Sequence, residues 1–344
     1  MMEEILHGAL RSSLRQLSLA ALLAAPLALG GCDDPGKGDV ADIEAVGAVG
    51  ARLIFDTNGN GRVDSGDRVL SGWTVNLEQP AGGLIASQVT DEEGEAIFEE
   101  VPVGRLVAGV PDEELGDTVS LLPSSVQPFI LEAFQSVQLT SVVTLPSFTV
   151  QEVRALPSAK PLFTEGIALN RLVQGDMTLH IWSGSTYLRI LSVEEATTFS
   201  PGDSVRVSGR TAVDNGVPVL DGQAVFRLVS SARAPTAVKL STGEAAGARA
   251  GSLDAALVEV NSADVLEVLD QGNDGVLVRV DDGTGPLRVR FRSFFNLDPG
   301  SVDAETDSFG YAVGLLVPVR LENSVVWEIH PRTPSDVLIV RTIG

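Results

Sequence analysis

The chain has 344 residues, and its 46 acidic residues exceed its 24 basic ones, which leaves a net charge of −22. A hydrophobic content of 44% is globular rather than disordered, and the length predicts two or three domains. The acidic excess disfavours general binding to phosphate backbones, and the single cysteine excludes an intrachain disulfide framework or a zinc site built from cysteines.

An apolar segment near the N-terminus indicates export. Two arginines precede a largely apolar run of 13 residues, 17–29, which is typical of a signal peptide and too short to span a bilayer comfortably. The run ends in the sequence LGGC, which resembles the lipobox of bacterial lipoproteins. The resemblance implies cleavage that removes residues 1–31 and lipidation of Cys32. Two or three acyl chains would then hold the protein in the bacterial cell envelope, at the outer membrane or the periplasmic face of the inner membrane. An ordinary signal peptide with an incidental cysteine is the alternative.

The pattern after Cys32 changes from a linker to strands. Residues 32–49 are rich in Gly, Asp and Ala, which predicts a flexible, lipidated tether. Farther along, apolar and polar residues alternate, as in 73–78, 204–208 and 287–292, and glycine-containing turns separate these runs. Convincing amphipathic helices are scarce. The alternation therefore predicts an all-β fold of short antiparallel strands in sandwiches or barrels.

Residues 56–67, DTNGNGRVDSGD, match the spacing of a twelve-residue calcium loop. Oxygen ligands recur at alternate positions, and Gly61 stands where such a loop turns sharply. The predicted ligands are the side chains of Asp56, Asn58, Asn60, Asp64 and Asp67 and the backbone carbonyl of Arg62. The last position is Asp instead of the usual Glu, and a polar turn that happens to be acidic is the alternative. No apolar helix flanks the loop, so we expect calcium to stabilise the fold rather than to signal.

The surroundings of this loop carry a family resemblance. Segments 53–55, 72–77, 90–94 and 101–104 resemble the B-type repeat of serine-aspartate-repeat surface adhesins and related prealbumin-like sandwiches. The resemblance implies a stalk or spacer domain without enzymatic activity. We therefore expect a prealbumin/Ig-like β-sandwich that carries the calcium loop at 50–150.

The rest of the chain resembles the bacterial extracellular OB-fold type. A Gly-Asp turn leads into the alternating strand at 204–208, an Asn-Gly hairpin follows, and a second copy of the pattern closes with residues 326–337. The resemblance implies two small OB-like β-barrels, at 151–235 and 236–344. It says little about function, because small barrels host many ligands.

Arginines on one strand of the second barrel form a candidate ligand face. Basic side chains interleaved with aromatic rings suit a platform for single-stranded nucleic acid, and Phe294 and Phe295 are close in sequence. Phe291 has the opposite, core-facing parity, and neighbouring aspartates can neutralise the arginines, so a solvated strand is the favoured interpretation. The residues of this face are Arg279, Arg288, Arg290 and Arg292.

Catalytic patterns are missing from the sequence. His180 and His330 are the only histidines beyond the predicted signal peptide, and each falls in a strand where a structural role is expected. No GxSxG, HExxH or phosphate-binding glycine loop occurs. We therefore predict a non-enzymatic, calcium-stabilised structural or interaction module. Its expected partners are the membrane, reached through Cys32, and a protein or polysaccharide, with nucleic acid disfavoured. The alternative is an accessory protein that binds oligosaccharide or single-stranded nucleic acid on a barrel face, and a secreted hydrolase is the weakest interpretation.

Overall fold

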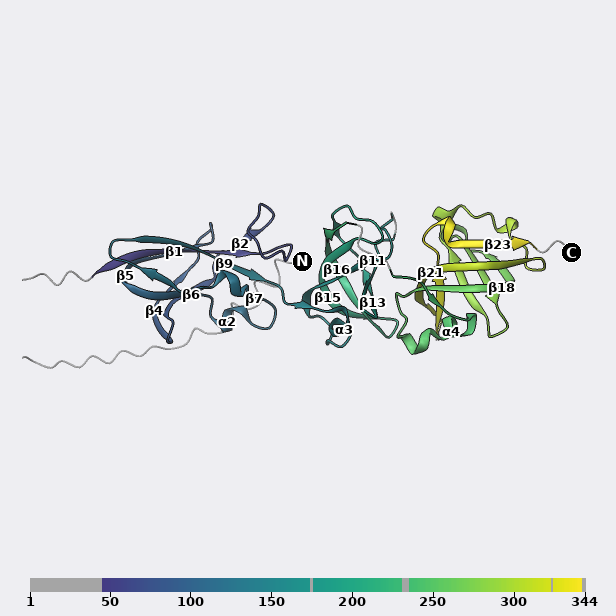
Figure 1. The fold of residues 1–344 in the computed structure, drawn as a ribbon, viewed down its shortest axis with the longest axis horizontal. Helices are drawn as coiled ribbons and strands as arrows, with labels where there is room; N and C mark the ends of the chain where they lie inside the picture. The colour runs from purple at the N-terminus through teal and green to yellow at the C-terminus, as the bar shows by residue number, and fades with distance from the viewer. Residues whose placement is uncertain (1–44, 174–175, 231–234, 323, 342–344) are drawn as a thin grey trace, which may run out of the picture. The chain divides into compact units, whose positions relative to one another are not determined.

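The computed structural model describes residues 45–173, 176–230, 235–322 and 324–341. Strands make up most of this part of the chain and the helices are short, which confirms the predicted all-β fold (Figure 1). The signal peptide predicted at 1–31, Cys32 and most of the predicted tether lie outside the described residues.

Residues 46–144 form two sheets. In the first, β1 (Val46–Phe55) is the central strand: β5 (Glu95–Pro102) and β2 (Arg68–Val69) pair with it antiparallel, and β9 (Ser136–Thr144) pairs with it in parallel. The short β7 (Ser120–Leu121) extends this sheet from β9. The second sheet has the order β4 (Gly83–Val89), β3 (Thr74–Gln79), β6 (Gly104–Gly109) and β8 (Phe129–Leu131).

A shared apolar core makes these two sheets a sandwich. Val49 and Phe98 from the first sheet lie in one buried cluster with Leu77 and Leu106 from the second. Buried and exposed residues alternate along β5, as expected for a strand with one face on the core and one face in water. The sequence pattern thus determines which face of each strand enters the core.

The next strands close into a five-stranded barrel. The closed order is β11 (Pro161–Ala168), β12 (Leu179–Ser183), β13 (Thr186–Leu191), β16 (Val217–Val229) and β15 (Ser204–Asp214), which pairs again with β11. Only β13 and β16 pair in parallel within this ring. The short strands β10 (Ser147–Phe148) and β14 (Glu195–Ala196) are added at the edges.

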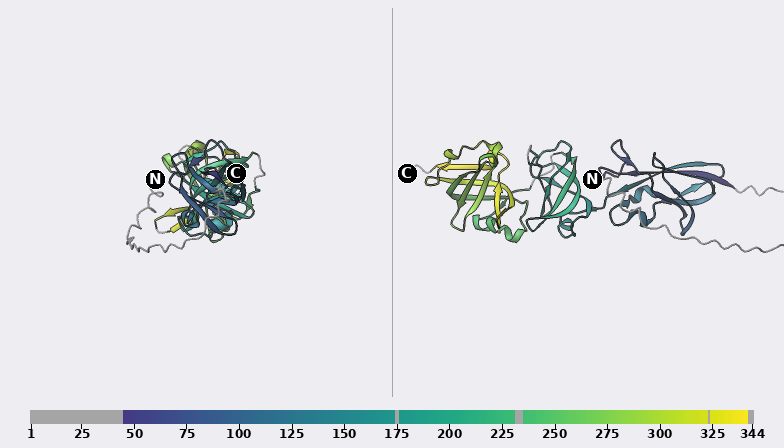
Figure 2. Two further views of the ribbon diagram at one scale, coloured as in Figure 1. Left: turned by 90° about the vertical axis from the view of Figure 1, so that its left-hand side faces the viewer. Right: turned by 180° about the vertical axis from the view of Figure 1, so that it is seen from behind.

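A second barrel repeats the same closed order. It runs through β18 (Leu257–Asp270), β19 (Val276–Asp281), β20 (Leu287–Phe291), β22 (Ser324–His330) and β21 (Asp307–Leu321), which returns to β18. The parallel pair is now β20 with β22. β17 (Val238–Lys239) and β23 (Val337–Arg341) are added strands. These strands, green to yellow, curl around a common interior (Figure 2). Five strands in this Greek-key order are the architecture of an OB-fold.

The helices are short and lie between strands. Two of them begin with a capping box, in which Thr149 and Glu152, and likewise Ser241 and Glu244, bond each other's backbone amides. Among the described residues, no helix has the length and apolar character needed to cross a membrane. The helices are α2 (Asp112–Leu115), α3 (Val150–Val153) and α4 (Thr242–Gly247), and the 3-10 turns are η1 (Pro123–Ser125), η2 (Ala248–Gly251), η3 (Gly272–Asp274), η4 (Ser293–Phe295), η5 (Pro299–Ser301) and η6 (Pro334–Asp336).

Candidate functional site

The candidate calcium loop connects β1 with β2 in the sandwich. Asp56 follows the last residue of β1 and is 1% exposed. Its two carboxylate oxygens accept hydrogen bonds from the backbone amides of Asn60, at 3.1 Å, and Gly61, at 2.7 Å. Gly61 has a φ of 72°, a left-handed conformation that glycine adopts without strain. Asp56 therefore holds the first turn of the loop in a closed form.

The second half of the loop closes on the same side chains. Asp64 Oδ2 accepts from the side-chain amides of Asn58, at 2.8 Å, and Asn60, at 2.9 Å. Asp67 accepts from the backbone amides of Thr57, at 3.0 Å, and Asp64, at 2.9 Å. Hydrogen bonds from Asn58, Gly66 and Asn60 lower the pKa of the exposed Asp64 carboxyl. The structure thus brings the five predicted side-chain ligands into one hydrogen-bonded network. The backbone amide of Arg62 joins it by donating to Asn60 Oδ1.

The chemistry of these donors fits a hard cation in part. Three carboxylates and two amide groups supply the oxygens that calcium prefers. Asn58 and Asn60 now direct their NH₂ groups at Asp64, so both amides must turn over to present oxygen to a metal. Within the described residues, no three or more His, Cys, Asp or Glu side chains are grouped so that they could hold a metal ion. A calcium ion here would therefore depend on the amides and on backbone carbonyls for much of its coordination.

The candidate arginine face lies on the second barrel, and each of its arginines is paired with an acid. Arg288 and Arg290 on β20 contact Glu328 on β22, with nitrogen–oxygen distances of 2.7 and 2.5 Å. Arg279 on β19 pairs with Glu267 at 2.9 Å, and Arg292 pairs with Asp176 at 3.0 Å. These ion pairs neutralise the charge that a phosphate backbone would need.

Glu328 is the centre of this cluster. Its side chain is fully buried, and one carboxylate oxygen also lies 3.3 Å from His330 Nε2. Burial raises the pKa of Glu328, but hydrogen bonds from His330 and Arg290 outweigh it and hold the pKa well below the usual range. Burial lowers the pKa of His330, an effect that the neighbouring Glu328 only partly offsets. The carboxylate is therefore charged at neutral pH and serves as an internal counter-ion for two arginines.

His180 lies on β12 of the first barrel and is buried. Its backbone amide donates to Asn170 Oδ1 at 2.8 Å, and its Nδ1 lies 3.3 Å from the same oxygen. Burial, and then the positive charge of Arg189, hold the pKa of His180 well below its usual range. The His180 imidazole is therefore neutral at physiological pH.

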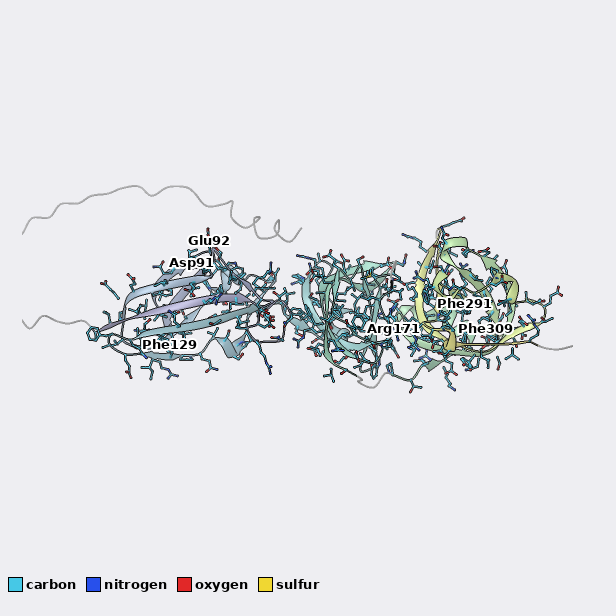
Figure 3. All side chains as sticks on the ribbon, turned by 90° about the horizontal axis from the view of Figure 1, so that it is seen from above. Asp91, Glu92, Phe129, Arg171, Phe291 and Phe309 are labelled. Carbon is cyan, nitrogen blue, oxygen red and sulfur yellow. The ribbon has the colours of Figure 1, made fainter. Side chains whose placement is uncertain are left out.

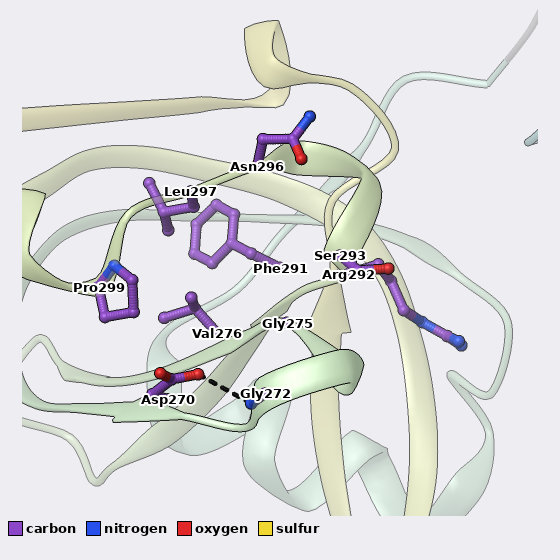
Figure 4. A pocket seen from close by; sticks show the side chains of 10 residues that line it. All are labelled: Asp270, Gly272, Gly275, Val276, Phe291, Arg292, Ser293, Asn296, Leu297 and Pro299. Atoms are coloured by element: carbon purple, nitrogen blue, oxygen red, sulfur yellow. Dashed lines mark hydrogen bonds between the residues drawn. The ribbon is translucent and has the colours of Figure 1, made fainter.

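A small recess of about 130 Å³ opens at one end of the second barrel (Figure 4). Phe291 forms part of its apolar lining, and Asp270 holds the adjacent turn through a 2.8 Å hydrogen bond from the Gly272 amide. Phe291 is 3% exposed and packs edge-on against Phe309, with ring centres 6.2 Å apart. The two rings lie in the second barrel (Figure 3). The recess is lined by apolar side chains from the barrel end and by the polar residues Asp270, Arg292, Ser293 and Asn296.

Sequence reasoning missed Glu328 as the partner of the arginines. The sequence does contain one hint: Glu328 stands between the apolar residues Trp327 and Ile329 in a predicted strand, where an acid needs a charged partner. The sequence analysis expected aspartates close in sequence to neutralise the arginines instead. One of these, Asp282, bonds Thr242 and Thr284 and clamps a turn. Asp91, in the turn after β4, accepts from the amides of Glu93 and Glu95 and has a similar turn-forming role (Figure 3).

Comparisons with known proteins show no family. No protein-family model matches the sequence, and no curated protein matches it significantly. Among solved structures, the hypothetical protein ygiW from E. coli is 15% identical over 24% of this chain and 97% of that chain, with a TM-score of 0.22. The tetrameric p202 HIN2 is 14% identical over 54% and 96%, with a TM-score of 0.26. A murine DNA binding protein bound with ds DNA is 9% identical over 54% and 100%, with a TM-score of 0.27. Scores this low assign neither fold nor function, so the OB-fold assignment rests on strand order alone.

Proposed function

We propose that this protein is a lipid-anchored, non-enzymatic structural or interaction module of the bacterial cell envelope, stabilised by calcium. The carrying observation is the loop between β1 and β2, where all five predicted side-chain ligands meet in one network around the buried Asp56. The loop supplies carboxylate and amide oxygens, which are the ligands that a divalent cation such as calcium prefers. The four arginines of the candidate ligand face, in contrast, are engaged in ion pairs.

Calcium titration tests the metal. If calcium reaches about 100 times its dissociation constant, binding stabilises the sandwich by about 2.7 kcal/mol. For a domain of about 100 residues this raises the melting temperature by about 11 °C. The double variant Asp64→Ala with Asp67→Ala should lose the rise, whereas Asp91→Ala, which alters only an exposed turn, should keep it. An unchanged melting temperature of the wild type in millimolar calcium would remove the metal from the proposal.

Membrane attachment is tested at Cys32. Metabolic labelling with a palmitate analogue should mark the wild type and not Cys32→Ser, and the variant should leave the membrane fraction. Labelling that persists in the variant would contradict the anchor.

The alternative function, binding of single-stranded nucleic acid or oligosaccharide, has a separate test. Single-stranded DNA should not be retained at low salt by the wild type, because the arginines of the face are already paired. Retention that disappears in the Arg288→Ala and Arg290→Ala variants would favour this alternative instead.

A further inference from the structure

One end of the sandwich exposes apolar side chains that its core does not use. Phe134 is 81% exposed, Ile130 on β8 is 67% exposed and Val103 is 41% exposed. We call these three residues the tether-end patch. Isolated apolar side chains are common on protein surfaces, so the location of this group matters more than its size.

The tether-end patch surrounds the point where the chain enters the sandwich. The backbone amide of Phe134 donates to the carbonyl of Val46, at 2.8 Å, and the amide of Val103 donates to the carbonyl of Ala45, at 3.2 Å. Ile130 lies on β8. The next residue on that strand, Leu131, pairs with Gly104, which directly follows Val103. Ala45 and Val46 are the first two described residues, so the patch lies at the point where the described chain begins.

Phe134 also has a backbone conformation that does not suit it. Its φ is 61°, and it is the third residue of a turn closed by a 3.2 Å hydrogen bond from the Gln135 amide to the Glu132 carbonyl. Gly or Asn is favoured at such a position, because a bulky side chain is strained there. An exposed ring in a strained conformation adds little to the stability of the sandwich, which points to a role for the ring at the surface.

We infer that the tether-end patch rests against the surface of the lipid bilayer and so orients the sandwich on the membrane. This inference rests on the proposed lipidation of Cys32. Thirteen residue steps separate Cys32 from Ala45, and a chain of that length spans at most about 45 Å when fully extended. The bilayer is therefore always within reach, and the patch is on the part of the sandwich that is closest along the chain. Phenylalanine and aliphatic side chains favour the boundary between headgroups and acyl chains.

The charged residues beside the patch bear on which lipid headgroups it can contact. Glu132 and Glu100 are exposed at this end, together with Arg105, and the chain as a whole is strongly acidic. Anionic headgroups would repel such a surface. The patch therefore fits a zwitterionic surface, such as phosphatidylethanolamine or phosphatidylcholine.

Tryptophan fluorescence in vesicles tests the contact. The lipidated mature protein carrying Phe134→Trp is bound to phosphatidylcholine vesicles that contain brominated acyl chains, and the wild-type signal from the three native tryptophans is subtracted. The matched control is Val89→Trp, on β4, because Val89 is 60% exposed and lies near the end of the sandwich where β1 ends. The emission of the tryptophan introduced by Phe134→Trp should shift to the blue, and it should be quenched severalfold more than the emission of the tryptophan introduced by Val89→Trp.

A second variant protects the test from a folding defect. Phe134→Asn suits the left-handed backbone and should fold. Amide hydrogen exchange across residues 129–135 on vesicles should be faster in this variant than in the wild type, and exchange across β4 should be the same. Equal quenching in the two tryptophan variants, or none in Phe134→Trp while the protein sediments with the vesicles, would overturn the membrane contact alone. A wild type that does not sediment with vesicles would overturn this inference and the lipid anchor together.

Discussion

Replacing Glu328 with glutamine tests the buried ion cluster of the second barrel. Glutamine has the same shape as glutamate but leaves two guanidinium groups without a counter-ion. The side chains of Arg288 and Arg290 are 22% and 13% exposed, so water screens the resulting charges only in part. Breaking a buried ion pair by removing one partner typically costs about 3–5 kcal/mol, and this partial exposure favours the lower end, about 3 kcal/mol. For a barrel of about 100 residues the melting temperature should fall by about 12 °C.

Differential scanning calorimetry is the suitable assay, because several domains can melt in separate transitions. Glu267→Gln is the matched control: its pair with Arg279 belongs to the same barrel, but both side chains are 41% exposed. Exposed pairs contribute at most about 1 kcal/mol. A loss for Glu328→Gln no larger than that for Glu267→Gln would refute the reasoning. The pKa of Glu328 is depressed in the folded protein, so its stabilisation is complete above the unfolded pKa of about 4.3 and is lost as the pH falls below that value. The variant should be insensitive to that loss.

Two further predictions concern turns and close packing. Burial raises the pKa of Asp282, but hydrogen bonds from Thr284 and Thr242 lower it to about 2, so the stability that it supplies should be lost as the pH falls from its unfolded pKa of about 3.9 toward 2. A carboxyl titration by NMR with a midpoint near 3.9 would contradict this. Gly209→Ala would place a Cβ 2.4 Å from the carbonyl oxygen of Asp221 on the paired strand and should cost about 2 kcal/mol in a urea melt. Gly247→Ala, where a Cβ meets no atom within 4 Å, should cost far less, and equal losses would argue against the crowding.

The alternation of apolar and polar residues predicted strands well, because a strand with one buried face requires an apolar residue at every second position. The runs at 73–78 and 287–292 correspond to β3 and β20, and no bound differs by more than one residue. The pairing of β1 with β9 had no such signal. Their partners lie about 88 residues apart, and a parallel pair leaves no hairpin turn between the strands to reveal it.

The same limit applies to the candidate sites. Strand parity placed Phe291 in the core and the arginines outside it, as the structure shows. The acid that neutralises Arg288 was not apparent, since it lies 40 residues away and is brought alongside only when β20 and β22 pair in parallel. The side chains of the candidate calcium loop lie within 12 consecutive residues, so spacing alone predicted that they would come together, and they do. Spacing does not encode the orientation of the Asn58 and Asn60 amides, whose NH₂ groups point at Asp64.

The parallel pairing of β1 with β9 has a mechanical consequence. Residues 48–55 align with residues 136–143, the chain enters at the start of β1, and it leaves for the barrels at the end of β9. A force that pulls the chain outward at these two points slides the strands along each other, so their evenly spaced hydrogen bonds share the load and must fail together. A hairpin pulled at its open end would instead unzip one bond at a time. The sandwich is therefore built to resist stretching along the chain.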